Sequence, residues 1–131
     1  MLVLDASAAI RVGMSTARAA LVDAVRDANE VVVPSLFDFE VTNVAWKYGA
    51  LGDWSSEDCL TLVDDVLAIP DRRVDGADLS AEVLSLGLLK KHATYDLFYV
   101  VLARRNAATL ATADAKLLKL CKSLGVAAVG A

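Results

Sequence analysis

The sequence predicts an α/β fold in which a parallel β-sheet is covered by helices on both faces. Short uncharged apolar runs keep alternating with stretches in which apolar residues recur at helical spacing. Uncharged strands are typical of a sheet that is buried on both sides, and strand–helix alternation is typical of parallel connections. Because 131 residues is close to the usual length of one domain, we expect a single domain over 1–131.

The first half of the chain predicts three strands and three helices. Residues 1–4 form a buried strand that ends at Asp5, and Asp5 could begin a local turn there. Residues 31–33 form a second strand, which is rich in β-branched residues. Ser15 is expected to cap a helix over 16–28. Ser35 and Asp38 resemble a capping box that opens a helix to about residue 51. Ser55 or Ser56 caps a helix to about 68, and a third strand lies within 70–74.

The second half predicts three more helices and two strands. A helix covers 79–91, and Thr94 caps the next one, which runs to 105. Residues 109–112 form a strand, after which Asp114 caps a helix to 124 and Gly125 ends it. Residues 126–129 form the last strand.

Composition excludes several classes of protein. Apolar residues make up 56% of the chain and the mean hydropathy is +0.49, which excludes a disordered protein. Uncharged stretches near the middle are about seven residues long, whereas a membrane-spanning helix needs about 20. Asp5 interrupts the apolar start, so we expect no signal peptide. Two separated cysteines predict reduced thiols in the cytoplasm, and a single histidine, His92, expected at a helix end, excludes a histidine-based zinc site.

Charge is unevenly distributed along the chain. Residues 1–86 carry six basic and fifteen acidic residues, and 87–131 carry seven basic residues but only two acids. The asymmetry indicates either an anionic partner for one face or basic solvent faces on the last helices.

Four carboxylates fall at positions that suggest a site. Asp5 and Asp114 follow strands, at the edge where parallel sheets bind ligands, and Asp96 lies in the first turn of a helix. Each of these three acids also has a purely structural reading as a cap or turn residue. Glu40 interrupts an apolar helix stripe, and Lys47, two turns away, is too distant to neutralise it. A hard cation such as Mg²⁺ or Mn²⁺ would neutralise Glu40. Ser7 and Thr112 could then orient carboxylates or water around that ion.

Four segments together resemble the PIN domain, most closely the VapC-like toxins of prokaryotic toxin–antitoxin pairs. They are 2–9 (LVLDASAA), 34–44 (PSLFDFEVTNV), 94–103 (TYDLFYVVLA) and 110–117 (LATADAKL). The resemblance implies a three-layer α/β/α fold and a ribonuclease that uses Mg²⁺ or Mn²⁺. It makes Asp5, Glu40 and Asp96 the principal ligands, with Asp114 completing the set directly or through water. Ser7, Thr112 and Asn43 would support them.

The resemblance also implies a homodimer that a small antitoxin protein silences. Phe39, Trp46 and Trp54 are candidates for a partner surface if they are exposed; the alternative is that all three lie in the core. RNA phosphates would be held by the basic residues of the last third, best by Lys116, which follows Asp114 by two positions. Tyr95 and Tyr99 could stack on bases, although Tyr99 could equally be core. The alternatives left open are a flap-type DNA nuclease or phosphatase, a Mg²⁺-binding phospho-acceptor module, and a catalytically silent PIN-like binding domain.

Overall fold

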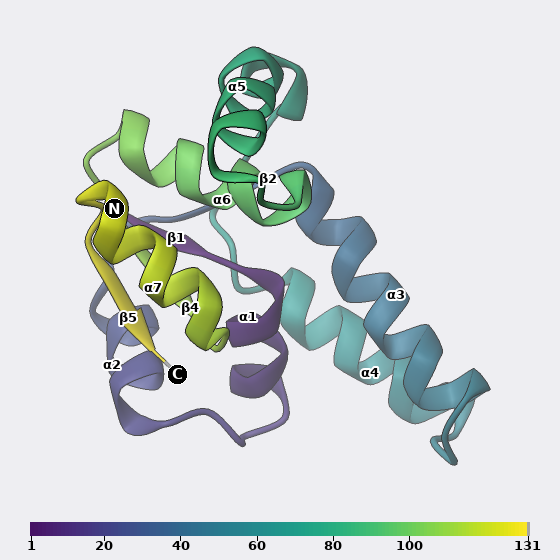
Figure 1. Ribbon diagram of the computed structural model, residues 1–131. Helices are drawn as coiled ribbons and strands as arrows, with labels where there is room; N and C mark the ends of the chain where they lie inside the picture. Colours follow the sequence, from purple (N-terminus) through teal and green to yellow (C-terminus); the bar gives the residue numbers. More distant parts are fainter. Residues whose placement is uncertain (131) are drawn as a thin grey trace.

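The structure, a computed structural model, describes residues 1–130 and contains a five-stranded sheet with helices in its connections (Figure 1). The strands are β1 (Leu2–Leu4), β2 (Val31–Pro34), β3 (Arg72–Val74), β4 (Thr109–Thr112) and β5 (Ala128–Gly130). They lie in the order β3-β2-β1-β4-β5, and every neighbouring pair is parallel. The predicted parallel sheet is therefore confirmed.

Helices cover both faces of the sheet. They are α1 (Ala6–Gly13), α2 (Ala19–Asp27), α3 (Leu36–Ala50), α4 (Ser56–Leu67), α5 (Ser80–Lys90), α6 (Thr94–Arg105) and α7 (Ala115–Leu124). The chain steps from β1 to β2 to β3 in one direction and then back to β4 and β5, so right-handed crossovers place α1–α4 on one face and α5–α7 on the other. The α6 helix packs on β1, β2 and β4, whereas α2 packs on β1, β4 and β5. The three-layer α/β/α arrangement is confirmed.

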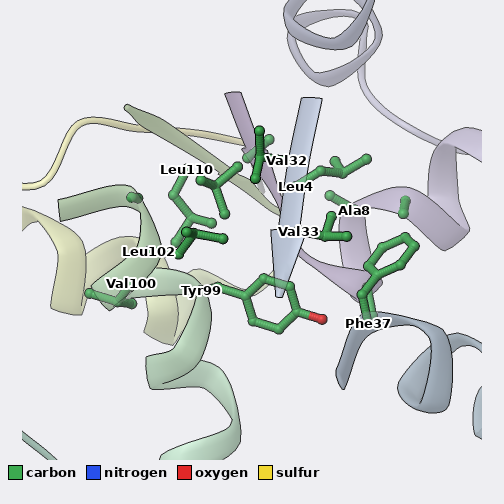
Figure 2. Close-up of a cluster of buried hydrophobic side chains, with 14 of the residues drawn as sticks. Leu4, Ala8, Val32, Val33, Phe37, Tyr99, Val100, Leu102 and Leu110 are labelled. Atoms are coloured by element: carbon green, nitrogen blue, oxygen red, sulfur yellow. The ribbon is translucent and has the colours of Figure 1, made fainter. Parts of the chain in front are cut away.

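The core forms where α6 and α3 meet the sheet. Figure 2 shows the ring of Tyr99 from α6 beside Val33 of β2 and Phe37 of α3, with its hydroxyl oxygen on the side where Phe37 lies. These three side chains are at most 1% exposed. Burying one such apolar side chain contributes roughly 1.5–3 kcal/mol. Packing of this kind fixes the position of α3 and α6 relative to the strand ends.

The segment after β1 corrects the first predicted helix. The predicted helix over 16–28 is present as the shorter α2, and an additional helix that was not predicted, α1, precedes it. Ser15 lies in the loop between them at φ +59° and caps neither. The carboxylate of Asp5 caps α1 by accepting from the backbone N–H of Ala8 at 2.9 Å. The same local bond fits a turn or a helix start, so the pattern alone did not distinguish them.

Two predicted caps are also wrong, because their side chains have other partners or positions. The Ser35 hydroxyl accepts from the N–H of Gly76 at 3.1 Å and caps nothing, and Asp38 pairs with Arg73. Thr94 is the first residue of α6 and makes no capping bond. Ser55 and Asp114 cap as predicted, Gly125 ends α7 in a left-handed conformation at φ +70°, and β5 begins two residues later than expected.

Apolar side chains remain on the outside of α3. Phe39 is 75% exposed and Trp46 is 58% exposed, as expected for a partner surface. Trp54 is half-buried and stacks on Tyr48 with ring centroids 4.9 Å apart, so its place is beside the core. The α3 and α4 helices pack against each other and extend away from the sheet (Figure 1). No helix within residues 1–130 is long and apolar enough to cross a membrane.

Candidate active site

A cavity of about 270 Å³ gathers the four predicted carboxylates. Its wall includes Asp5 from the end of β1, Glu40 from α3, Asp96 from α6 and Asp114 from the start of α7. The parallel strands bring Asp5 and Asp114 to the same edge, because β1 and β4 are neighbours in register. Ser7 and Asn43, which the sequence also singled out, line the same cavity. Residues far apart in the chain thus form one acidic hollow.

Asp5 is the most tightly held of the four. It is 5% exposed, and its Oδ1 accepts from the Ser7 hydroxyl at 2.7 Å and the Ala8 N–H at 2.9 Å. Its Oδ2 accepts from the Thr112 hydroxyl. Burial raises the pKa of Asp5, while these donors, led by Thr112, act in the opposite direction. A carboxylate has about four acceptor positions, so Oδ2 keeps one for a ligand.

Ser7 and Thr112 tie the two strand ends together. Thr112, which is fully buried, also accepts from the N–H of Asp114 at 3.0 Å, and the Ser7 hydroxyl accepts from the N–H of Ala113 at 3.1 Å. The carboxylate of Asp114 in turn accepts from the N–H of Lys116 at 2.8 Å and caps α7. These bonds orient Asp5 and Asp114 toward the same cavity, which is the supporting position expected for both hydroxyl groups.

Glu40 is held by a residue that sequence reasoning had assigned differently. The Tyr99 hydroxyl donates to Oε1 of Glu40 at 2.6 Å, across 59 positions in the chain. Tyr99 is 1% exposed, so the hypothesis that it stacks on a base is wrong, whereas Tyr95 is 70% exposed. Partial burial raises the pKa of Glu40, Tyr99 opposes that shift, and the charges of Asp96 and Asp5 add to it.

Asp96 completes a set of mutually repelling charges. It is half-buried, and desolvation raises its pKa. The charge of Asp114 raises this pKa further, whereas His92, just beyond the end of α5, opposes the shift. In the folded chain, the carboxyls of Asp5, Glu40 and Asp96 all favour the neutral form more than they do in water.

The wall of the cavity also includes a positively charged side chain that we had not expected there. Lys47 lines the wall with Glu40, although we expected it to lie too far along the helix. The spacing i, i+7 keeps both residues on one face of α3, and the long lysine side chain spans the two turns. Lys116, the preferred RNA contact, is exposed in the first turn of α7, and its backbone is what contacts Asp114. The i, i+7 spacing was the signal that could have identified Lys47.

The donor chemistry of the cavity suits a hard cation, although the donors do not yet converge. No group of three or more His, Cys, Asp or Glu side chains within residues 1–130 stands in an arrangement that could hold a metal ion. All four acids offer oxygen ligands, as Mg²⁺ and Mn²⁺ prefer, and three of them have raised pKa values that a cation would reverse.

Comparison with known proteins identifies the chain's relatives. A family model described as the PIN domain matches residues 2–123. A solved structure, PAE2754 from Pyrobaculum aerophilum, is similar with a TM-score of 0.76 and 23% sequence identity. That likeness covers 98% of this chain and 83% of the other, and at this identity it concerns the fold. No curated protein sequence matches.

Proposed function

This chain belongs to the PIN-domain family, and we propose on that premise that it is a metal-dependent endoribonuclease that hydrolyses RNA phosphodiester bonds. PIN domains are generally nucleases. The observation that carries the proposal is the meeting of Asp5, Glu40, Asp96 and Asp114, from four separate elements, around one cavity. A purely structural cap explains Asp114 or Asp5 singly, but it gives no reason for Glu40 to face the other acids.

In this proposal, Asp5, Glu40 and Asp96 hold the ion and Asp114 completes the set. Mg²⁺ or Mn²⁺, when bound there, would supply Lewis-acid activation of water and would neutralise charge on the phosphate. Thr112 and Ser7 keep Asp5 oriented, and Tyr99 keeps Glu40 oriented. With no histidine in the cavity wall, a carboxylate there takes the proton from the attacking water. Lys47 at the same wall offsets the acids' repulsion of the phosphate.

Metal dependence is the first test of this function. The purified protein should cleave structured RNA, such as tRNA and rRNA, with Mg²⁺ or Mn²⁺ present, and EDTA should stop the reaction because the carboxylates alone cannot activate water. Gel analysis of end-labelled RNA with each ion and with EDTA measures it. Cleavage that continues in EDTA contradicts the metal mechanism. Cleavage of no RNA with either ion favours a catalytically silent domain.

A phospho-acceptor module has less support from the topology. Such a module needs adjacent acids at the end of the first strand, where this chain has Asp5 followed by Ala6, and an acceptor aspartate after the third strand. Here β3 lies at the edge of the sheet, separated from β1 by β2. The carboxylate of Asp75, which follows β3, accepts a hydrogen bond from the backbone N–H of Ala77. Acyl-phosphate labelling, which a nuclease should not show, distinguishes the two functions.

The finer biological role in our proposal is that of a cytoplasmic toxin in a type II toxin–antitoxin pair. A small antitoxin protein would silence the nuclease, and the resemblance to VapC-like toxins supports this role. A short upstream reading frame for a small DNA-binding protein, whose product inhibits RNA cleavage when added, is the expected finding. Its absence from the neighbouring genes would contradict the toxin role and leave the nuclease proposal in place.

We also propose a homodimer that covers the exposed aromatic side chains of α3. Phe39 and Trp46 are both more than half exposed, and such apolar area usually marks an interface. Phe39→Ser should convert a dimer to a monomer at micromolar concentration, because a buried aromatic anchor of this kind contributes at least about 2 kcal/mol. Light scattering measures the mass, and Leu60→Ser on α4, at a side chain that is 65% exposed, is the matched control. A monomeric wild type would refute the dimer.

A further inference from the structure

Two arginines stand apart from the rest because they pair with no acid among the residues that the structure describes. Five of the seven arginines form ion pairs: Arg26 with Asp23 and Asp27, Arg72 with Glu30, Arg73 with Asp38, and Arg104 and Arg105 with Glu82. Within residues 1–130, only the arginines at 11 and 18 make none. A guanidinium is always charged, and its fork of donors matches the oxygens of carboxylates and phosphates. Two guanidinium groups in one place, with no acidic partner among residues 1–130, are available to an anion.

The loop between α1 and α2 brings these arginines together. The N–H groups of Thr16 and Ala17 both donate to the carbonyl of Arg11, at 2.8 and 3.1 Å. Ser15 adopts the left-handed conformation that reverses the chain at this point. As a result, Arg11 and Arg18 line one hollow of about 160 Å³, together with Thr16 and Ala113.

This hollow lies near the carboxylate cavity. Ala113 follows Thr112 directly, and its N–H donates to Ser7, which bonds to Asp5. A further depression on the surface borders on both. It shares Arg11 and Thr16 with the arginine hollow, and it shares Ser7 and Val44 with the acidic cavity. A chain molecule whose phosphate lies at the carboxylates can therefore follow the surface to the arginines.

We propose that Arg11 and Arg18 bind a backbone phosphate of the RNA strand to one side of the phosphate that is cleaved. This inference rests on the proposed function. An acidic cavity repels RNA, so affinity must come from cations beside it, and phosphate contacts fix the register of the strand without reading its sequence. Arg104 and Arg105, which the sequence had offered for this task, are both engaged by Glu82. The arginine hollow takes their place.

Alanine at each arginine tests the assignment. Using a labelled single-stranded oligoribonucleotide, we expect Arg11→Ala and Arg18→Ala each to raise KM roughly tenfold while kcat stays unchanged, because uniform binding is lost. Anisotropy in EDTA, where the RNA stays intact, should show the same rise in Kd. In the double variant, Arg11→Ala with Arg18→Ala, the salt dependence of binding should weaken by about 0.7 in the logarithmic slope, because one phosphate is no longer neutralised. Arg26→Ala is the matched control, since it removes the same charge from α2 at a paired, exposed arginine.

The outcomes separate this inference from the nuclease proposal. If wild type cleaves RNA and the double variant matches Arg26→Ala in KM and Kd, the arginine site is wrong and the nuclease stands. If wild type binds RNA through these arginines but cleaves nothing, the nuclease is wrong and the site stands. Wild type that binds no RNA overturns the site. The double variant Arg11→Lys with Arg18→Lys tests whether the alanine variants are merely misfolded. Lysine keeps the positive charge, so this variant should recover part of the RNA affinity. A folding defect caused by loss of the arginines would give no such recovery.

Discussion

Replacing Asp96 with asparagine should abolish RNA cleavage without destabilising the metal-free protein. The substitution keeps the shape and removes one ligand charge, so the fall in activity should exceed the roughly 10–100-fold that changes around metal ligands cost. In EDTA the variant should melt at the same temperature as wild type or higher, because desolvation and Asp114 raise the pKa of Asp96 and make its charge unfavourable in the folded state. Thermal melting and RNA cleavage of the same preparations measure both effects.

Added metal should then distinguish the two proteins. Wild type should gain about 2.7 kcal/mol at an ion concentration a hundred times its Kd, which is roughly 10 °C in a chain of this size, and Asp96→Asn should gain much less. Asp58→Asn is the control, because Asp58 is also a first-turn acid, on α4, and lies outside the carboxylate cavity. If Asp96→Asn loses as much stability in EDTA as Asp58→Asn, then Asp96 serves its helix and must leave the catalytic set.

The sequence predicted the sheet and the acids because both depend on local signals. A run such as Leu2–Leu4 has no polar alternation, and an acid directly after a strand must lie at its carboxyl end. Asp114 caps α7 by a bond to a residue two positions away, which is readable from spacing. Glu40 was found because a carboxylate among apolar neighbours on a helix requires a compensating partner. These inferences need only the chain near each residue.

What escaped prediction depends on contacts between distant segments. The bond from Tyr99 to Glu40 spans 59 positions, and the bond from Gly76 to Ser35 spans 41. No local sequence pattern predicts either hydrogen bond, because each depends on how α3 packs against its neighbours. The unpaired state of Arg11 was likewise invisible, because which arginines are neutralised is decided by the tertiary fold. Sequence reasoning therefore located the acids of the site and missed the groups that hold and surround them.

Replacing Thr112 with valine should destabilise the metal-free protein although it leaves every carboxylate in place. Thr112 is fully buried, donates to Asp5 and accepts from the N–H of Asp114, so valine of similar shape leaves both groups without that partner. Losing a buried partner costs about 1–3 kcal/mol, and chemical denaturation in EDTA measures it. Thr112→Ser should keep most of the stability because it keeps the hydroxyl. Thr109→Val, at the other end of β4, is the control for valine in this strand.

The size of this loss should depend on pH in a direction set by Asp5. Burial raises the pKa of Asp5 above its ordinary value of 3.8, so the folded chain holds that proton more tightly than the unfolded chain does. The resulting contribution to stability is complete below the ordinary value and is lost as pH rises through the raised one. Valine removes the strongest of the donors that oppose the shift, which raises the pKa of Asp5 further and extends the loss to higher pH. In EDTA, the stability gap between wild type and Thr112→Val should therefore widen from acid to neutral pH, and a gap that is constant over this range would show that Thr112 does not control the ionisation of Asp5.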